Sequence, residues 1–212
     1  MLEVPGIAPL IGIGVYYGAA MTEAATYRGQ DICIVGAANS AGQGALFFSR
    51  YARQVTMLIR GDSLTKSMSQ YLIDRILATS NIDVRTHAEI TGVAGDGHLE
   101  SVSVRCVDDD SEQHINASAM FIFIGAAPRS EVMAGIIERD ENGFILTGPD
   151  LPRVNGNIKG WTLDRDPFLC ETNVPGIFAV GDVRSGANRR VAAAVGEGSA
   201  TVHMVHRYLE TV

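Results

Sequence analysis

A short run of small residues, Gly36-Ala37-Ala38-Asn39-Ser40-Ala41, follows an apolar segment and precedes one with helical periodicity. A strand that enters a helix through such a turn points backbone N–H groups at a pyrophosphate. The usual pattern is Gly-x-Gly-x-x-Gly or Ala, and the Ala38 methyl group at its second position narrows the approach to phosphate. The motif alone fits a purely structural turn about as well, but its place between strand and helix favours dinucleotide binding.

The residue at the end of the next strand selects the cofactor. An Asp or Glu there accepts hydrogen bonds from a ribose 2′-hydroxyl, whereas an Arg suits a 2′-phosphate. This chain has Arg60 at that point, and the nearest acid, Asp62, lies two residues further on. NADP(H) is therefore favoured over NAD(H), although an isolated Arg at a strand end is often only solvated.

The pattern of apolar residues predicts the elements that position this turn. Residues 31–35 and 55–59 are short apolar runs that predict buried parallel strands. Apolar residues recur at helical spacing over 40–52 and 67–78. The span from 32 to 59 is therefore a strand–turn–helix–strand unit.

The later part of the chain predicts further strands and a final helix. Two-residue alternation over 90–93 and 99–107, around the turn residues 94–97, predicts a β-hairpin. Residues 119–124 and 176–180 predict buried strands, with an irregular stretch over 140–170. A helix is expected from about residue 190 to residue 209.

Composition limits the class of protein. Hydrophobic residues make up 46% of the 212 residues and charged residues 19%, which is typical of a globular protein. The net charge of −7, without clusters of Lys and Arg, argues against nucleic acid as a partner. Many Gly and Pro residues interrupt the uncharged stretch 4–22, which argues against a membrane-spanning helix.

The cysteines and the weaker clusters indicate no metal or disulfide framework. Cys33, Cys106 and Cys170 are far apart, and Cys33 lies within an apolar run as a buried core thiol would, so a reducing cytoplasm is the expected compartment. His203 and His206 lie one helical turn apart without a visible third ligand, so a surface or packing role is favoured. The run 108–110 of three Asp residues predicts a solvated turn.

The order of three segments resembles the second half of a thioredoxin reductase-like flavoprotein. These segments are Gly14-Val15-Tyr16-Tyr17-Gly18-Ala19-Ala20-Met21, then the turn at 36–41, then Val174-Pro175-Gly176-Ile177-Phe178-Ala179-Val180-Gly181-Asp182. In that family a Cys-x-x-Cys pair stands where this chain has Gly18 and Met21. The resemblance therefore implies a reductase scaffold without its dithiol, and without the N-terminal half of the flavin domain.

The resemblance also implies roles for residues that spacing alone does not assign. Gly181-Asp182 resembles the second flavin motif, whose Asp accepts hydrogen bonds from the ribityl chain. Arg189, Arg190 and Val191 open a helix similar to the one whose N-terminus faces the flavin's pyrimidine edge. The alternative is an Asp in a turn before a core helix. At the 2′-phosphate site the family has His-Arg-Arg and a further Arg, where this chain has Ile59, Arg60, Gly61 and Thr65, with Lys66 adjacent.

The implied fold is α/β, a Rossmann-like NAD(P)-binding domain with a β-hairpin insertion, flanked by two segments of an incomplete FAD-binding domain. Residues 1–23 would be a remnant of the FAD domain and its connection. Residues 24–140 would form the NADPH-binding domain, with Gly125 after its last strand. Residues 141–212 would be the C-terminal segment of the FAD domain.

The implied activity is hydride transfer from NADPH to FAD in the full-length parent, followed by electron transfer to an acceptor protein or small molecule without a dithiol. This chain by itself is expected to be inactive, and a homodimer is among the expected assemblies. One alternative is a thioredoxin-disulfide reductase proper, against which the missing dithiol argues. The other is a non-catalytic module that binds nucleotides or other proteins.

Overall fold

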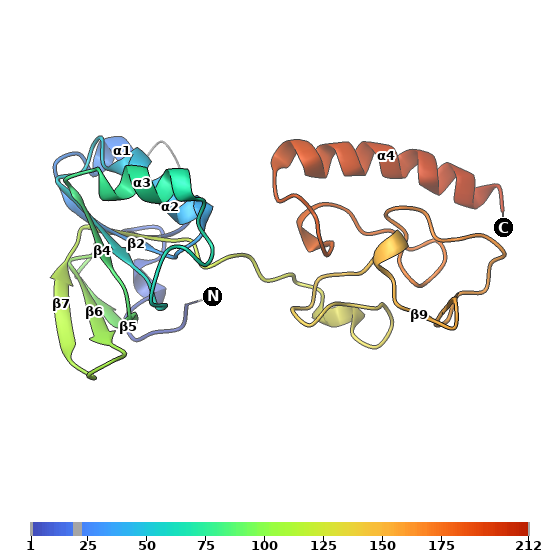
Figure 1. Cartoon of the computed structure of the whole chain (residues 1–212), viewed down its shortest axis with the longest axis horizontal. Helices are drawn as coiled ribbons and strands as arrows, with labels where there is room; N and C mark the ends of the chain where they lie inside the picture. Colours follow the sequence, from blue (N-terminus) through green and yellow to red (C-terminus); the bar gives the residue numbers. More distant parts are fainter. Residues whose placement is uncertain (1, 19–22, 212) are drawn as a thin grey trace. The chain divides into compact units, whose positions relative to one another are not determined.

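The computed structural model describes residues 2–18 and 23–211, and the chain divides into two compact units, Met1–Gly125 and Ala126–Val212 (Figure 1). The centre of the first unit is a five-stranded parallel sheet with strand order β1-β8-β2-β3-β4. Its strands are β1 (Val15–Tyr17), β2 (Asp31–Val35), β3 (Gln54–Leu58), β4 (Ile82–Arg85) and β8 (Ala119–Ile122).

The two faces of this sheet carry different layers. Short helices lie on one face, and an antiparallel sheet of order β5-β6-β7 lies on the other (Figure 1). The alternation of side chains along β2 shows why, since Ile32 and Ile34 pack with the helices while Cys33 and Val35 pack toward the second sheet. The elements of these outer layers are η1 (Ala8–Leu10), α1 (Glu23–Thr26), α2 (Asn39–Phe48), α3 (Gln70–Leu77), β5 (Ala88–Ala94), β6 (Ser101–Cys106) and β7 (Glu112–Asn116).

The predicted elements of the first unit are confirmed, with small differences at their ends. Helix α2 ends at Phe48 rather than Ala52, and α3 begins at Gln70 rather than Ser67. The predicted hairpin is β5 and β6, but it belongs to a three-stranded sheet whose third strand, β7, was not predicted. Strand β7 is mostly exposed and has Ile115 as its one apolar residue, so no alternating pattern marked it.

The second unit contains little regular structure apart from a long C-terminal helix. The predicted helix is confirmed as α4, Val191–Leu209. A small apolar cluster of Ile137, Ile145 and Ala179 forms its core. The remaining elements are short: η2 (Glu131–Met133), η3 (Gly148–Asp150), β9 (Arg153–Val154), β10 (Asn157–Ile158) and η4 (Gly181–Val183).

The predicted strand at 176–180 is wrong. The hydrogen bonds of this segment are local, from the Thr172 amide to the Ile177 carbonyl and from the Ala179 amide to the Cys170 carbonyl. They form one isolated bridge, between Glu171 and Phe178, rather than a ladder. An apolar run becomes a strand only where a neighbouring strand supplies regular partners, and the described residues place none beside it.

The boundary between the compact units falls after Gly125, whereas the sequence placed 126–140 with the nucleotide-binding domain. Strand β1, from the segment predicted to connect the two domains, pairs with β8 as the edge of the parallel sheet. The assignment of 1–23, 24–140 and 141–212 to domains of the family remains a prediction.

Candidate functional site: a dinucleotide pocket and a second flavin-type motif

Gly36 cannot be replaced without moving the backbone around it. Its φ is 135°, a conformation that residues with a Cβ rarely adopt. A Cβ built on Gly36 would lie 2.6 Å from the carbonyl oxygen of Phe123, just beyond β8. The turn therefore brings β2 and the segment after β8 closer together than any other residue type allows.

The first turn of α2 presents backbone amides without a side-chain cap. Ala38 is the N-cap residue, with φ −91° and ψ 174°, and it makes no capping hydrogen bond. The amide of Gly42 is the first to bond back, to the Ala38 carbonyl at 3.1 Å. The amides before it have no carbonyl four residues earlier within the helix, so the N-terminus of α2 is suited to an anion.

Close packing holds this helix against the sheet. Ala41 is fully buried, as the motif predicts. A Cβ on Gly44 would lie 2.9 Å from Cζ of Phe123, and one on Gly42 would lie 2.8 Å from Sδ of Met68. These two glycines of α2, which the motif did not single out, admit the side chains that fix the helix beside the turn.

Two side-chain hydrogen bonds join the turn to the segment that follows β3. Ser67 donates from Oγ to the carbonyl of Ala37 at 2.9 Å. The amide of Ser69 donates to Oδ1 of Asn39 at 2.8 Å. The position of the turn therefore depends on residues about thirty positions further along the chain.

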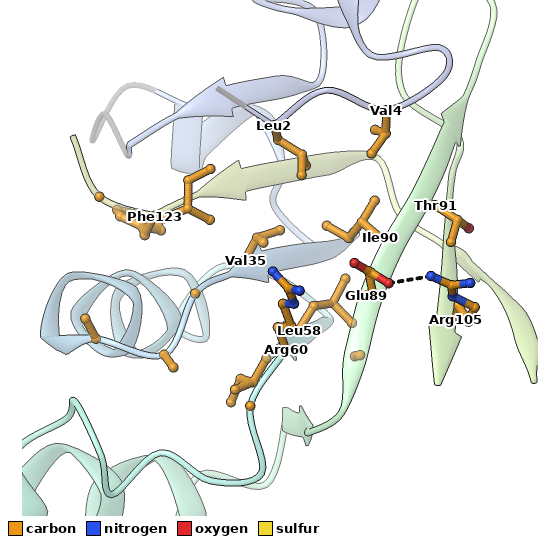
Figure 2. A pocket seen from close by; sticks show the side chains of 18 of the residues that line it. Leu2, Val4, Val35, Leu58, Arg60, Glu89, Ile90, Thr91, Arg105 and Phe123 are labelled. Atoms are coloured by element: carbon orange, nitrogen blue, oxygen red, sulfur yellow. Dashed lines mark hydrogen bonds and ion pairs between the residues drawn. The ribbon is translucent and has the colours of Figure 1, made fainter. Parts of the chain in front are cut away.

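A cavity of about 900 Å³ opens at the carboxyl ends of β2, β3 and β8 (Figure 2). Strand β2 lies between β3 and β8, so this edge of the sheet is the point where strand order reverses, the usual ligand site of such folds. The cavity brings together predicted residues from three segments, namely Gly36, Ala37, Ala38, Arg60 and Gly125. Of the predicted turn residues, Asn39, Ser40 and Ala41 do not line it.

Arg60 and Lys66 have different surroundings. Arg60 is exposed, lines the cavity, and makes no hydrogen bond or ion pair with any residue that the structure describes (Figure 2). Lys66 does not line the cavity, and its Nζ lies 2.9 Å from Oδ2 of Asp62. This hydrogen bond from Lys66 holds the pKa of Asp62 below its ordinary value. Arg60 is therefore the cation available to a ligand, and the predicted role of Lys66 remains a prediction.

The antiparallel sheet contributes an acid and a base to the cavity that the motifs did not reveal. Glu89 of β5 and Arg105 of β6 are cross-strand partners, and Nη2 of Arg105 lies 2.6 Å from Oε2 of Glu89 (Figure 2). Both side chains line the cavity. The hydrogen bond from Arg105, and then the charges of Arg105 and Arg60, hold the pKa of Glu89 below its ordinary value. Only the register of the predicted hairpin could have paired these residues from sequence.

In the second unit, Gly181 and Asp182 open η4 just before α4. Gly181 has φ 68°, and a Cβ there would lie 3.1 Å from Cβ of Ala194. Its amide donates to Oε2 of Glu197 at 2.7 Å, which ties the motif to α4. Asp182 is exposed, and its carboxylate has no hydrogen-bond or ion-pair partner in the described part of the chain.

The predicted residues at the start of α4 lie at its exposed end. Arg190 is the N-cap residue without a side-chain cap, and Val191 is 83% exposed. The guanidinium of Arg189 lies over the ring of Phe144, 4.4 Å from its centroid. Arg184 makes an ion pair with Glu197 at 2.5 Å, and its hydrogen bond lowers the pKa of Glu197.

The described cysteines give no sign of a redox pair. All three are free. Cys33 is fully buried, which confirms it as a core residue, and burial raises the pKa of its thiol to about 12. Gly18 has φ 86° and donates its amide to the Ile122 carbonyl at 2.9 Å, while Met21 lies outside the described residues.

The weaker clusters gain no support as ligand sites. His203 and His206 are exposed on α4, and no group of three or more metal-binding side chains occurs in the residues with a described position. The run 108–110 is an exposed turn, as predicted. No described helix is both long enough and apolar enough to cross a membrane.

Comparison with known proteins identifies the family. The family model described as pyridine nucleotide-disulphide oxidoreductase matches residues 2–198. The chain belongs to this family. It is 32% identical over 208 residues to a thioredoxin reductase of Mycolicibacterium smegmatis, covering 98% of this chain and 60% of that protein. The NADPH-dependent thioredoxin reductase 3 of Arabidopsis thaliana is 29% identical over 185 residues, covering 86% of this chain and 31% of that protein.

The solved structures agree with this assignment. The crystal structure of Lactococcus lactis thioredoxin reductase in its FR conformation matches with a TM-score of 0.77 and 27% identity, covering all of this chain and 63% of that one. The chain thus spans less than two thirds of the length of these relatives. The predicted α/β, Rossmann-like fold and the thioredoxin reductase-like membership of the pyridine nucleotide-disulphide oxidoreductase family are both confirmed.

Proposed function

We propose that this chain is the pyridine-nucleotide part of a thioredoxin reductase-like flavoprotein, in which NADPH donates a hydride to FAD. The observation that carries the proposal is the cavity that joins Gly36, Arg60 and Gly125 at the carboxyl edge of the parallel sheet. The glycine turn and the uncapped N-terminus of α2 suit a pyrophosphate. Arg60, which makes no hydrogen bond or ion pair with the described residues, suits a 2′-phosphate.

The second unit fits part of a flavin. The Asp182 carboxylate could accept hydrogen bonds from ribityl hydroxyls, and the uncapped N-terminus of α4 at Arg190 and Val191 could stabilise negative charge at the edge of a reduced ring. When bound, FAD supplies the hydride-accepting chemistry. Residues 31–48 form the one strand–turn–helix unit of the dinucleotide-binding type that the described residues contain. We therefore expect this 212-residue chain alone to lack FAD and to be inactive.

The electron acceptor is proposed to be a protein or small molecule that does not need a dithiol at residues 18–21. Disulfide reduction requires one thiol to attack and another to resolve, and Gly18 and Met21 supply neither. A thioredoxin-disulfide reductase proper remains the alternative suggested by the names of the relatives. The other alternative is a non-catalytic module that binds a nucleotide in the same cavity. This alternative predicts no NADPH-dependent electron transfer by the full-length protein.

The experiment is calorimetric titration of the 212-residue chain with NADPH and with NADH, beside an absorbance scan for flavin. NADPH should bind more tightly, and Arg60→Ala should reduce that preference about 10-fold, the value of one charge-assisted contact. Arg75→Ala, which removes an exposed cation from α3, is the control and should leave the preference unchanged. Equal affinities of the wild type for the two nucleotides would refute the role of Arg60, and absence of any binding would refute the proposed function.

A further inference from the structure

One acidic side chain of the nucleotide cavity, that of Glu89, does not come from the parallel sheet. In such folds the residue that selects the cofactor usually follows a parallel strand, here β3. Glu89 lies on β5, in the antiparallel sheet that packs on the face of the parallel sheet opposite the helices, and its side chain is 34% exposed. It shares the cavity with Arg60, which follows β3. In Figure 2 the Arg60 guanidinium and the Glu89 carboxylate lie on neighbouring walls of the same cavity.

Glu89 is in contact with one cation of the cavity, Arg105, and shares the cavity with the other, Arg60. The hydrogen bond from Arg105 and then the positive charges of Arg105 and Arg60 lower the pKa of Glu89, so the carboxylate is ionised at neutral pH. Arg105 is shared further, because its Nη1 lies 3.4 Å from Oδ1 of Asp110. An anion that approaches Arg60 therefore meets the negative charge of Glu89, which Arg105 offsets only in part because Arg105 also pairs with Asp110.

We propose that Glu89 is a specificity-determining residue of this pocket, which weakens binding of nucleotides with a 2′-phosphate relative to those with a free 2′-hydroxyl. The inference rests on the proposed function, since it assumes that the cavity takes an adenosine nucleotide. A carboxylate repels a phosphate and accepts a hydrogen bond from a ribose hydroxyl. Glu89 thus supplies the acid that the end of β3 lacks, and Arg60 and Glu89 pull the cofactor preference in opposite directions.

A purely structural role for Glu89 predicts a different outcome. Glu89 and Arg105 are direct cross-strand partners, and such pairs add a small amount to sheet stability. If that were the whole role, neutralising Glu89 would lower the stability of the sheet slightly and would change the affinities for all nucleotides alike.

The test uses adenosine 2′,5′-bisphosphate and adenosine 5′-monophosphate, titrated calorimetrically into the wild type, Glu89→Gln and Glu112→Gln. Glu112 is the matched control, because it is the partner of Arg105 on the other side, in β7, but is exposed and does not line the cavity. Glu89→Gln should tighten binding of the bisphosphate about 5-fold, as expected for one like charge removed from a partly solvated site, and the gain should shrink at high salt. Binding of the monophosphate should change less than about 2-fold, and Glu112→Gln should alter neither.

An unchanged ratio of the two affinities in Glu89→Gln would overturn the inference, as would an equal change for both nucleotides. The proposed function would survive that outcome for Glu89→Gln, provided that the wild type binds both nucleotides and that Arg60→Ala weakens binding of the bisphosphate only. If the wild type binds neither nucleotide, the proposed function fails and the inference fails with it.

Discussion

Among the residues that the structure describes, the first unit buries two large apolar clusters on the two faces of one sheet, whereas the second buries one small cluster around Ile137, Ile145 and Ala179. The burial of ion pairs follows the opposite order, since the buried ion pair lies in the second unit. In the first unit they are at the surface, as for Arg53 and Asp31 at 2.5 Å, with the Arg53 side chain 71% exposed. In the second unit Glu171, which pairs with Arg165, is fully buried.

Glu171 does in the second unit what apolar packing does in the first. Its two oxygens accept from Nη1 and Nη2 of Arg165 at 2.7 and 3.0 Å, and from the amides of Phe168 and Gly176 at 2.9 and 3.0 Å. Arg165 in turn lies over the ring of Phe168, 4.0 Å from its centroid. One carboxylate thus holds together loops that have no sheet to join. The difference teaches that a buried ion pair holds the loops of the second unit to one another. In the first unit, by contrast, the geometry of the nucleotide site depends on the backbone conformation of the turn.

The largest expected effect is therefore loss of this buried carboxylate. Glu171→Ala should lower the free energy of unfolding of the second unit by about 3–5 kcal/mol, because it leaves the charge of Arg165 without its partner. Trp161 is the chain's single tryptophan, and its Nε1 donates to the Arg165 carbonyl at 2.6 Å. Its fluorescence during urea unfolding reports this region directly.

Glu141→Ala, which removes an exposed acid from the same unit, is the control for Glu171→Ala and should cost less than about 0.5 kcal/mol. A loss below about 1 kcal/mol in Glu171→Ala would mean that the small apolar cluster, rather than the ion pair, holds the second unit together.

The next effect concerns the backbone of the first unit. Gly36→Ala should weaken NADPH binding at least about 10-fold, since both the positive φ and the contact with the Phe123 carbonyl oppose a Cβ. Gly97→Ala is the matched control. Gly97 also has a positive φ, 70°, but nothing lies within 4 Å of its added Cβ. Similar losses of NADPH affinity in the two variants would assign the effect to general backbone strain and not to the close approach at the turn.

The two units should unfold at different pH values when the protein is acidified. Glu171 and Glu197 have lowered pKa values in the folded chain. At Glu171 burial raises the pKa, but hydrogen bonds from Arg165 and two backbone amides outweigh this effect. At Glu197 the hydrogen bond from Arg184 is the main cause. Their stabilisation is complete above the ordinary Glu pKa of 4.5 and is lost as pH falls through the lower native values, because the unfolded chain takes up protons first.

Asp62 and Glu89 of the first unit also have lowered pKa values, but their ion pairs are more exposed than those of Glu171 and Glu197, so losing them costs the first unit less. Trp161 fluorescence should therefore change at higher pH than the near-ultraviolet tyrosine signal, since five of the six tyrosines are in the first unit. Coincident acid transitions would contradict this.

Sequence patterns predicted the first unit better than the second for a physical reason. Strands β2, β3 and β8 are buried on both faces, so their apolar runs are unambiguous, and the turn and Arg60 follow from their ends. The run at 176–180 looks the same in sequence but lacks a neighbouring strand among the described residues. Glu89 and Arg105 depend on a register across two strands, and no local motif carries that information.

The smallest expected effect tests the hydrogen bond that joins the turn to the segment after β3. Ser67→Ala removes the hydrogen bond to the Ala37 carbonyl, which sits at an exposed site and is worth about 1 kcal/mol at most, so NADPH affinity should fall about 2- to 5-fold. Ser63→Ala is the matched control. Its hydroxyl bonds to Thr65 Oγ1 at 2.7 Å in the same segment, and it does not line the cavity. Equal affinities in the wild type and Ser67→Ala would show that packing by Gly42 and Gly44 alone positions the turn. A fall confined to Ser67→Ala would mean that the segment after β3 contributes both the cation at Arg60 and part of the geometry of the phosphate site.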